Sequence, residues 1–436
     1  MNLSTAFLNL ERIYISRKMI KKIIHDGDIY NPNFFSGFNL DVINDVAKIK
    51  KIDINSGNEI DGYEYHVSFV GFLLDARDDV LLSLPKQYKH SPGNEELECR
   101  QILKALVKYS ELHYGTLSNY INSKDLSCNF PFDSFFGIYE YYKKYGLYHD
   151  QKIEISAKQH GKIDWKSTIH LTKKYVIDDD VVIFPIFRKK SVNIETFLTI
   201  CMAFAINYTI TKFYFFFDYP LVDVDFDLSS YDLLGNKQVV LSELEKIKKN
   251  TFSDVKTSLI NNLICFFQRL SGKKSYFLKC YNFSAIWETA IRLYVCNHFD
   301  GEDSGKLKIS DQKKVPKEFI KPTFYPNSAK PNEFMQPDCY FIDAKNQYIL
   351  DAKYYLHIDG IMYKELSYVF LLKEIRDYIN DSPKYKTTIC ALLLPSDSRK
   401  TALSFEMNPL FNLEFQDLKI YEEYFDIRIV LEEFVS

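Results

Sequence analysis

The segment from Gln347 to Tyr355 places charged side chains inside an otherwise apolar strand pattern, which restricts what the chain can build around it. Side chains alternate between the two faces of a β-strand, so Asp351 and Lys353 share one face and their apolar neighbours occupy the other. The segment therefore predicts a strand with one face that carries the charged side chains, which are candidates for catalysis, and one face that packs in the core.

A second strand is predicted at Cys339–Ile342, and the polar segment Asp343–Gln347 can turn the chain back. The resulting hairpin would lay Asp338 beside Asp351. Two carboxylates on adjacent strands form a hard oxygen site for Mg²⁺, which the backbone carbonyl of Ala352 would complete. The alternative is an exposed hairpin face with ordinary charge pairs.

The Asp-x-Lys pattern recurs elsewhere in the chain, so its context must indicate which copy belongs to a site. Pro337-Asp338 is the only Pro-Asp dipeptide, and only Asp351 lies within a strand at a hairpin's distance after it. The nearest competitor, Asp343-Ala-Lys345, falls in the predicted turn, where we expect its side chains to face solvent.

A helix is predicted upstream of the hairpin, because apolar residues recur at three and four steps over Phe283–His298. Glu288 lies in this apolar segment beside Trp287, and a buried acid is costly unless a cation or donor meets it. Glu288 is therefore a candidate for the site, and the alternative is a residue at the boundary between core and solvent. Downstream, a helix is predicted at Met362–Ile379 and a buried strand at Thr387–Leu394.

This order of helix, hairpin, helix and strand resembles the PD-(D/E)xK nuclease core of restriction endonucleases. Glu288, Pro337-Asp338 and Asp351-Ala-Lys353-Tyr354 match the motif. A closer resemblance is to McrC-like nuclease subunits, particularly the LlaJI-type restriction endonucleases. The resemblance implies that Glu288, Asp338, Asp351 and Lys353 are catalytic, and that Glu288, Asp338, Asp351 and Ala352 hold Mg²⁺, for which Mn²⁺ would substitute. Many nucleases of the superfamily carry a Gln on the following helix, where this chain has Lys364 and Glu365, to which we assign no role.

Two segments nearer the amino terminus carry the same resemblance: the hairpin Phe69–Leu74 with Val80–Lys86, and Gly161–Ile169. In McrC-like systems the amino-terminal region couples the nuclease subunit to a separate AAA+ GTPase. The resemblance thus implies such a partner here, with residues 1 to about 170 in contact with it. The residues implied in partner binding are Val70, Gly71, Leu84, Pro85 and Lys86.

Charge is unevenly placed along the chain. Residues 237–330 contain 17 Lys and Arg against 9 Asp and Glu, although the whole chain has a net charge of −3. A basic region before the predicted site suits the phosphates of double-stranded DNA, and the alternative is a set of solvated surface cations. The acidic remainder would face water or a protein partner. The candidate DNA-binding residues are Arg269, Lys273, Lys274, Lys279, Lys313, Lys314 and Lys317.

Several classes of protein are disfavoured. The eight cysteines lack Cys-x-x-Cys spacing, which argues against a zinc site or a disulfide framework and fits a reducing cytoplasm. No export signal is visible, and Thr196–Thr211, the longest uncharged stretch, is too short to span a membrane. Gly272-Lys-Lys-Ser275 lacks the leading glycine of a phosphate-binding loop, so we expect no nucleotide to be bound by this chain itself.

The expected fold class is mixed α+β, with a carboxy-terminal restriction-endonuclease-like core and an amino-terminal β-rich and helical region. Three domains are predicted: a partner-coupling domain at 1–125, a mixed α/β domain at 126–255 and the nuclease domain at 256–436. Other expectations are that Phe213–Tyr219 is a buried strand and that 300–326 is a loop. Further helices are expected at Asn94–Tyr114, Phe132–Tyr145 and Ile194–Thr211, and around Ser242.

The sequence therefore predicts a cytoplasmic, Mg²⁺-dependent DNA endonuclease subunit of a McrBC-like restriction system for phage defence, acting with a separate AAA+ GTPase. Two alternatives keep the same fold: a non-catalytic DNA-binding or GTPase-activating adaptor, and an autonomous endonuclease. An RNA endonuclease with a similar core is a further possibility.

Overall fold

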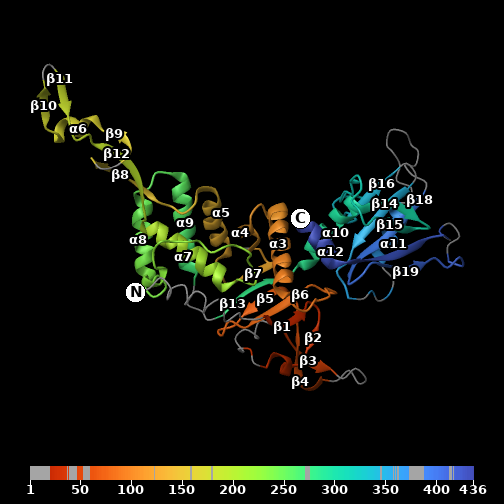
Figure 1. The fold of residues 1–436 in the computed structure, drawn as a ribbon. Coiled ribbons are helices and arrows are strands. Elements are labelled where there is room, and N and C mark those ends of the chain that lie inside the picture. Colours follow the sequence, from red (N-terminus) through yellow and green to blue (C-terminus); the bar gives the residue numbers. More distant parts are fainter. Residues whose placement is uncertain are drawn as a thin grey trace. The chain divides into compact units, whose positions relative to one another are not determined.

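The computed structural model describes all residues except 1–19, 37, 39–46, 53–58, 122, 158–159, 178–179, 271–274, 344–345, 357, 359, 361–362, 373–386, 412–414 and 416. The described residues form two compact units. We call them the sheet unit, within 10–129 and 273–436, and the helical unit, within 130–272. Figure 1 labels their elements.

The first sheet of the sheet unit draws its strands from separate parts of the chain. Its order is β1-β6-β5-β13-β7, in which β1 is parallel to β6 and the other neighbours are antiparallel. Strand β13 follows the helical unit in sequence and pairs with both β5 and β7, which joins distant segments into one unit. The strands are β1 Ile20–His25, β5 Val70–Leu74, β6 Val80–Leu84, β7 Leu126–Cys128 and β13 Tyr276–Cys280.

Gly71 shows how closely β5 and β13 approach each other. Its φ is +145°, and a Cβ atom added there would lie 2.1 Å from the carbonyl oxygen of Leu278 in β13. Glycine alone fits this position, because any side chain would collide with the neighbouring backbone. A small sheet and helices α3 and α4 lie in the same unit. Their elements are β2 Ile29–Tyr30, β3 Ala47–Ile52, β4 Glu59–His66, the 3₁₀ turn Pro32–Phe35, α3 Glu95–Tyr114 and α4 Leu117–Ile121.

The second sheet of the sheet unit has the order β16-β17-β18-β20-β19. Strands β17, β18 and β20 are parallel to one another, and β16 and β19 close the edges as antiparallel strands. Ile349 of β17 packs in one cluster with Tyr368 and Val369 of α11, so the odd-numbered side chains of β17 face that helix. The elements are α10 Phe283–His298, β14 Phe299–Asp303, β15 Lys306–Ile309, β16 Cys339–Ile342, β17 Asn346–Ala352, α11 Tyr363–Leu372, β18 Thr387–Ser396, β19 Lys400–Glu406, β20 Lys419–Asp426 and α12 Ile427–Val435.

The helical unit has an aromatic core between its helices. Phe132 of α5 lies 4.9 Å from Phe213, and Phe135 lies 5.0 Å from Phe217, measured between ring centroids. Thr196 caps α7 by accepting a hydrogen bond from the Thr199 amide, which sets where this helix begins. The helices are α5 Phe132–Tyr145, α7 Phe197–Lys212, α8 Lys237–Lys249 and α9 Asp254–Arg269, and Leu228–Ser230 forms a 3₁₀ turn.

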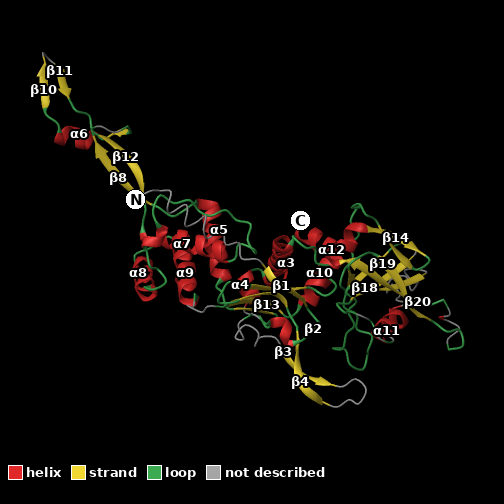
Figure 2. Ribbon diagram, turned by 60° about the horizontal axis from the view of Figure 1, so that its bottom comes forward, coloured by secondary structure: helices red, strands yellow, loops and turns green. Residues whose placement is uncertain are grey.

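Residues 150–194 of the helical unit form what we call the arm, which consists of short strands and one short helix (Figure 2). Strand β12 pairs with β8 and β9, and β10 pairs with β11, all antiparallel. The elements are β8 Asp150–Ser156, β9 Lys162–Ile163, α6 Trp165–Leu171, β10 Lys174–Ile177, β11 Asp180–Ile183 and β12 Arg188–Ile194.

The mixed α+β class is confirmed, as are the predicted hairpins and most of the predicted helices. Helix α11 is described only to Leu372, so the rest of the helix predicted at Met362–Ile379 lies outside the described residues. No described helix has the length and apolar character needed to cross a membrane.

Two local predictions are wrong. The aromatic run Phe213–Tyr219 is largely buried, but it forms turns after α7 rather than a strand, because packing against α5 can bury rings without a sheet. The segment 300–326 is not a simple loop, since β14 and β15 pair within it.

The two compact units also divide the chain differently from the three consecutive domains expected, because β13 returns to the first sheet.

Candidate active site

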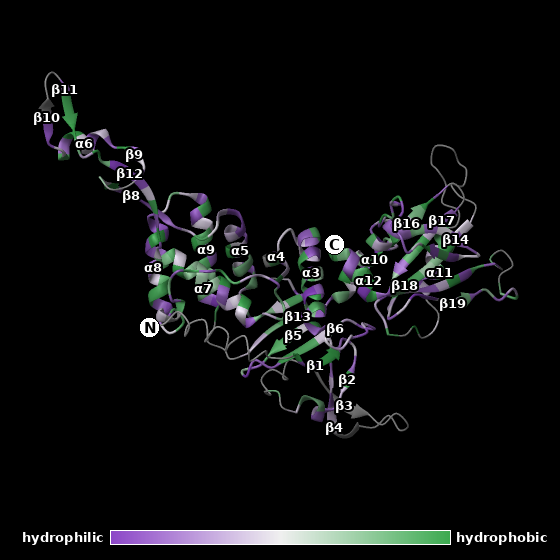
Figure 3. Cartoon of the chain, viewed as in Figure 1, coloured by the Kyte–Doolittle hydropathy of each residue, from purple (hydrophilic) through white to green (hydrophobic). Residues whose placement is uncertain are grey.

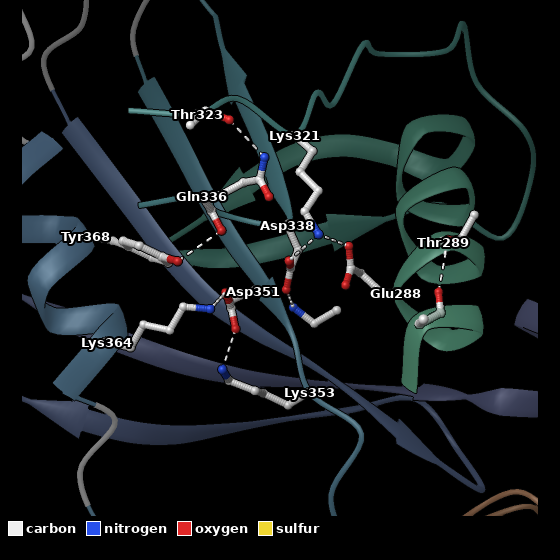
Figure 4. A network of polar contacts seen from close by, with 12 residues as sticks. Glu288, Thr289, Lys321, Thr323, Gln336, Asp338, Asp351, Lys353, Lys364 and Tyr368 are labelled. Carbon is white, nitrogen blue, oxygen red and sulfur yellow. Dashed lines mark hydrogen bonds and ion pairs between the residues drawn. The ribbon is translucent and has the colours of Figure 1, made fainter. Parts of the chain in front are cut away.

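The hairpin β16–β17 places Asp338 and Asp351 next to each other. Cys339 pairs with Leu350, so the residue before Cys339 and the residue after Leu350 lie side by side across the two strands. Asp351 is 1% exposed and Asp338 is 8% exposed. Strand β17 is flanked on its other edge by β18, where Asp351 pairs with Leu392. The predicted pair of carboxylates is therefore brought together at one end of the sheet (Figure 4).

The Asp338 carboxylate has a defined partner on each oxygen. Its Oδ2 accepts a hydrogen bond of 3.0 Å from the Ala352 amide, and its Oδ1 lies 3.2 Å from Lys321 Nζ. Burial, together with the neighbouring charges of Asp351 and Glu288, raises the pKa of Asp338 to about 6, although Lys321 opposes the shift. A buried carboxyl group with a raised pKa is typical of sites that accept a cation or a proton.

Glu288 lies on α10, which Trp287 fixes against the sheet. The fully buried Trp287 ring donates a hydrogen bond from Nε1 to the carbonyl oxygen of Leu393 in β18, at 3.3 Å. The Glu288 side chain is 31% exposed and forms an ion pair with Lys321. Glu288 thus lies near the predicted site, but it contacts Asp338 through the ammonium group of Lys321 (Figure 4).

Asp351 is held by two lysines from different elements. Lys353 Nζ lies 2.5 Å from Asp351 Oδ2, and Lys364 Nζ of α11 lies 3.1 Å from Oδ1. The Lys353 backbone amide also donates a hydrogen bond to the carbonyl oxygen of Leu393, at 2.9 Å, which continues the pairing of β17 with β18. Asp351 and Lys353 therefore share a face as predicted.

Glu365 of α11 is 0% exposed, and its Oε1 lies 2.8 Å from Lys353 Nζ. Asp351 Oδ2 and both Glu365 oxygens nevertheless lack a hydrogen bond of good geometry to any described residue. Burial lowers the pKa of Lys353, but Asp351 and Glu365 outweigh it and raise that pKa above its ordinary value. Lys353 therefore remains a cation between two buried carboxylates.

Sequence reasoning missed Lys321, and it assigned no role to Lys364 and Glu365. A signal for Glu365 existed, because an acid in the apolar helix Tyr363–Leu372 is costly to bury without a cation. Lys321 had no comparable signal, since it lies in a polar segment 17 residues before Asp338.

The donor set suits a hard divalent cation. Asp338 and Asp351 supply carboxylate oxygens from adjacent strands. Asp351 Oδ2 lies beside the Lys353 ammonium group but has no hydrogen bond of good geometry within the described part of the chain. Such oxygen donors are those that Mg²⁺ prefers. Among the described residues, no three His, Cys, Asp or Glu side chains lie close enough together to hold a metal ion between them. The suitability of the site for a divalent cation therefore depends on Asp338 and Asp351.

The candidate DNA-binding residues are dispersed. Lys313 and Lys314 are exposed and lie 3.5 Å from Glu433 and 3.3 Å from Asp300, and Lys317 is also exposed. Lys279 is 1% exposed, so it is not a surface cation. Its ammonium group lies 4.7 Å from the ring centroid of Phe277 and 5.4 Å from that of Phe69.

Arg269 belongs to the helical unit, where it forms a salt bridge of 2.6 Å with Asp133. Lys273 and Lys274 lie outside the described residues.

Most of the residues expected to bind a partner are buried. Val70, Gly71, Leu84 and Pro85 lie inside the first sheet or directly after it, without the exposure that partner binding requires. Lys86 is half-buried, and its backbone amide donates a hydrogen bond of 2.9 Å to the Tyr354 hydroxyl. Lys86 therefore connects the end of the first sheet to the candidate site, because Tyr354 directly follows Lys353.

The second sheet, with its hairpin of two buried aspartates and an adjacent lysine, has the arrangement expected from the resemblance to a PD-(D/E)xK nuclease core. A model of the LlaJI restriction endonuclease family matches residues 69–425. The chain therefore belongs to the LlaJI restriction endonuclease family.

No curated protein sequence matches the chain. Among solved structures it is similar to one described as the refined half-complex from the tetradecameric assembly of Thermococcus gammatolerans McrB AAA+ hexamers with bound McrC. The identity is 13%, the match covers 95% of this chain and 98% of that chain, and the TM-score is 0.35.

Proposed function

We propose that this protein is a Mg²⁺-dependent DNA endonuclease that hydrolyses phosphodiester bonds at Asp338, Asp351 and Lys353. The observation that carries the proposal is the pair of buried aspartates on adjacent strands with the Lys353 ammonium group 2.5 Å from one of them. The family to which the chain belongs supports the same conclusion.

Each residue has a role that follows from its contacts. Asp338 and Asp351, with the carbonyl of Ala352, would hold Mg²⁺ or Mn²⁺, and the Ala352 amide orients Asp338. When bound, the ion supplies charge neutralisation for the scissile phosphate and activates water. Lys353 is held as a cation by Asp351 and Glu365, so it offsets negative charge on the phosphate rather than acting as a base.

The test is cleavage of double-stranded DNA with Mg²⁺ by the Asp351→Asn variant. We expect a rate at least about 1,000-fold lower, because a ligand and the partner of Lys353 are both changed. Asp343→Asn in the same hairpin is the matched control, since Asp343 bonds Asn346 and Tyr348 away from the site. Cleavage by Asp351→Asn at the wild-type rate would refute the assignment, and an RNA substrate in parallel tests the RNA alternative.

We further propose that a separate AAA+ GTPase binds the arm. The arm exposes large apolar side chains that its own small sheets do not cover, and Figure 3 shows apolar residues on its strand β11. Exposed apolar surface of this kind marks sites of protein association. The most exposed are Phe184, Leu171, Ile153, Val181 and Trp165, at 70%, 68%, 64%, 59% and 58%.

This proposal moves the expected contact from the buried hairpin residues to residues 150–194. It is tested by co-purification of the wild type and of a Trp165→Ser, Leu171→Ser variant with any AAA+ GTPase encoded beside this protein. Binding by the wild type alone, and GTP-dependent cleavage only when both proteins are present, are the expected results. Robust site-specific cleavage by the chain with Mg²⁺ alone would exclude an obligatory partner.

A further inference from the structure

Lys321 occupies a central place in the site. Its Nζ lies 3.2 Å from Asp338 Oδ1 and forms an ion pair with Glu288 Oε1. Figure 4 shows Lys321 on the Glu288 side of Asp338, whereas Asp351 lies on the other side. One ammonium group therefore bridges two of the four residues that the PD-(D/E)xK resemblance implies to be catalytic.

Backbone pairing fixes where Lys321 lies. The preceding residue, Ile320, exchanges two hydrogen bonds with Tyr340 of β16, at 3.0 and 2.8 Å. Further along the same segment, Phe324 and Met335 exchange another pair, at 2.9 Å each. The segment thus runs as an added edge beside the hairpin, and Lys321 projects from a braced position.

Charge decides what else can bind there. A divalent cation shared by Glu288 and Asp338 would have to occupy the space of the Lys321 ammonium group, and two cations so close repel each other strongly. A cation shared by Asp338 and Asp351 would lie on the other side of Asp338 from Lys321. It requires the ammonium groups of Lys353 and Lys364, which lie 2.5 and 3.1 Å from the Asp351 oxygens, to move off that carboxylate.

We propose that Lys321 takes the place of a second divalent ion, so that this nuclease centre binds a single divalent cation at Asp338 and Asp351. Glu288 then holds Lys321 and does not ligate metal, and the ammonium group supplies a fixed positive charge beside the phosphate. The proposal rests on the proposed function, because it presupposes the metal centre there.

The test is calorimetric titration of the DNA-free protein with Mn²⁺ alone, which requires no activity. We expect one equivalent for the wild type and two for Lys321→Met, because removal of the ammonium group frees Glu288 and Asp338 for a second ion. The double variant Lys321→Met, Glu288→Gln should return to one equivalent. Lys330→Met is the matched control and should keep one equivalent, because the Lys330 ammonium group pairs with the exposed Glu333 in the same segment.

Binding of two equivalents of Mn²⁺ by the wild type, or of one equivalent by a folded Lys321→Met variant, would contradict the proposed role of Lys321. If the Lys321→Met variant does not fold, the same Mn²⁺ titration of the Glu288→Gln variant tests whether Glu288 ligates the metal. A centre in which Glu288 only holds Lys321 still binds one equivalent of Mn²⁺ at saturation, whereas a centre in which Glu288 shares an ion with Asp338 loses that ion. The Asp351→Asn variant separates the role of Lys321 from the proposed function. If this variant still binds Mn²⁺, the assignment of the metal centre to Asp338 and Asp351 is wrong, independently of the role of Lys321.

Discussion

The candidate site buries charged side chains, whereas the arm exposes large apolar side chains, and both differ from the usual distribution in which apolar groups are buried and charged groups are exposed. In the site, charged groups are buried: Asp351 and Glu365 are 1% and 0% exposed. In the arm, Leu171 and Phe184 are 68% and 70% exposed. Buried charges require partners within the fold, whereas exposed apolar surface requires a partner outside it. Substitutions in the site should therefore change stability and activity together, and substitutions in the arm should leave the isolated chain nearly unchanged.

The largest effect on stability is expected from Lys353→Met. It leaves Glu365 buried without a counter-charge, which should lower the free energy of unfolding by about 3–5 kcal/mol and reduce cleavage by at least about 100-fold. Urea unfolding and single-turnover cleavage measure the two effects.

The double variant Lys353→Met, Glu365→Leu sharpens this result. Removal of both members of a buried pair should restore most of the stability without restoring cleavage. Recovery of cleavage together with stability would mean that Lys353 is structural only.

A smaller effect concerns pH. The pKa of Asp338 is raised from 3.8 to about 6, so the folded protein binds this proton more tightly than the unfolded chain does. The contribution of Asp338 to the free energy of unfolding of the metal-free protein should therefore be largest below pH 4 and fall by about 1–3 kcal/mol as pH rises to 6. Asp338→Asn should lose this part of the pH dependence. An unchanged profile in thermal unfolding scans with a chelator would contradict the buried position of Asp338.

Glu365→Gln should have an intermediate effect on rate. The amide keeps the size of the side chain but not its charge, so Lys353 is held less firmly, and kcat should fall about tenfold with little change in KM. Glu423→Gln is the control, because Glu423 is also 0% exposed but pairs with Arg399 away from the site. Equal loss of kcat in both variants would indicate a general effect on folding.

The smallest effect is expected in the arm. Leu171→Ala should change the free energy of unfolding by less than about 0.5 kcal/mol, because its side chain is already in water. Leu198→Ala in α7 of the same unit, where Leu198 is 1% exposed, should cost about 2–5 kcal/mol. Similar losses in chemical denaturation would show that the arm packs against other parts of the chain.

Local patterns in the sequence determined the hairpin, the face shared by Asp351 and Lys353, and the helix that carries Glu288. Alternation and helical periodicity act over a few residues, and a hairpin sets its own register, so these features could be predicted without distant contacts. The family resemblance followed from the same short motifs.

Only the tertiary structure decided which distant residues meet at the site. Lys321 reaches Asp338 through an edge pairing, and Glu365 reaches Lys353 from α11. The same holds for Gly71 and Lys279, which a sequence pattern assigned to binding and which lie inside the first sheet, because β13 returns there after the helical unit. Such pairings depend on how segments far apart in the chain pack, and no short sequence window contains that information.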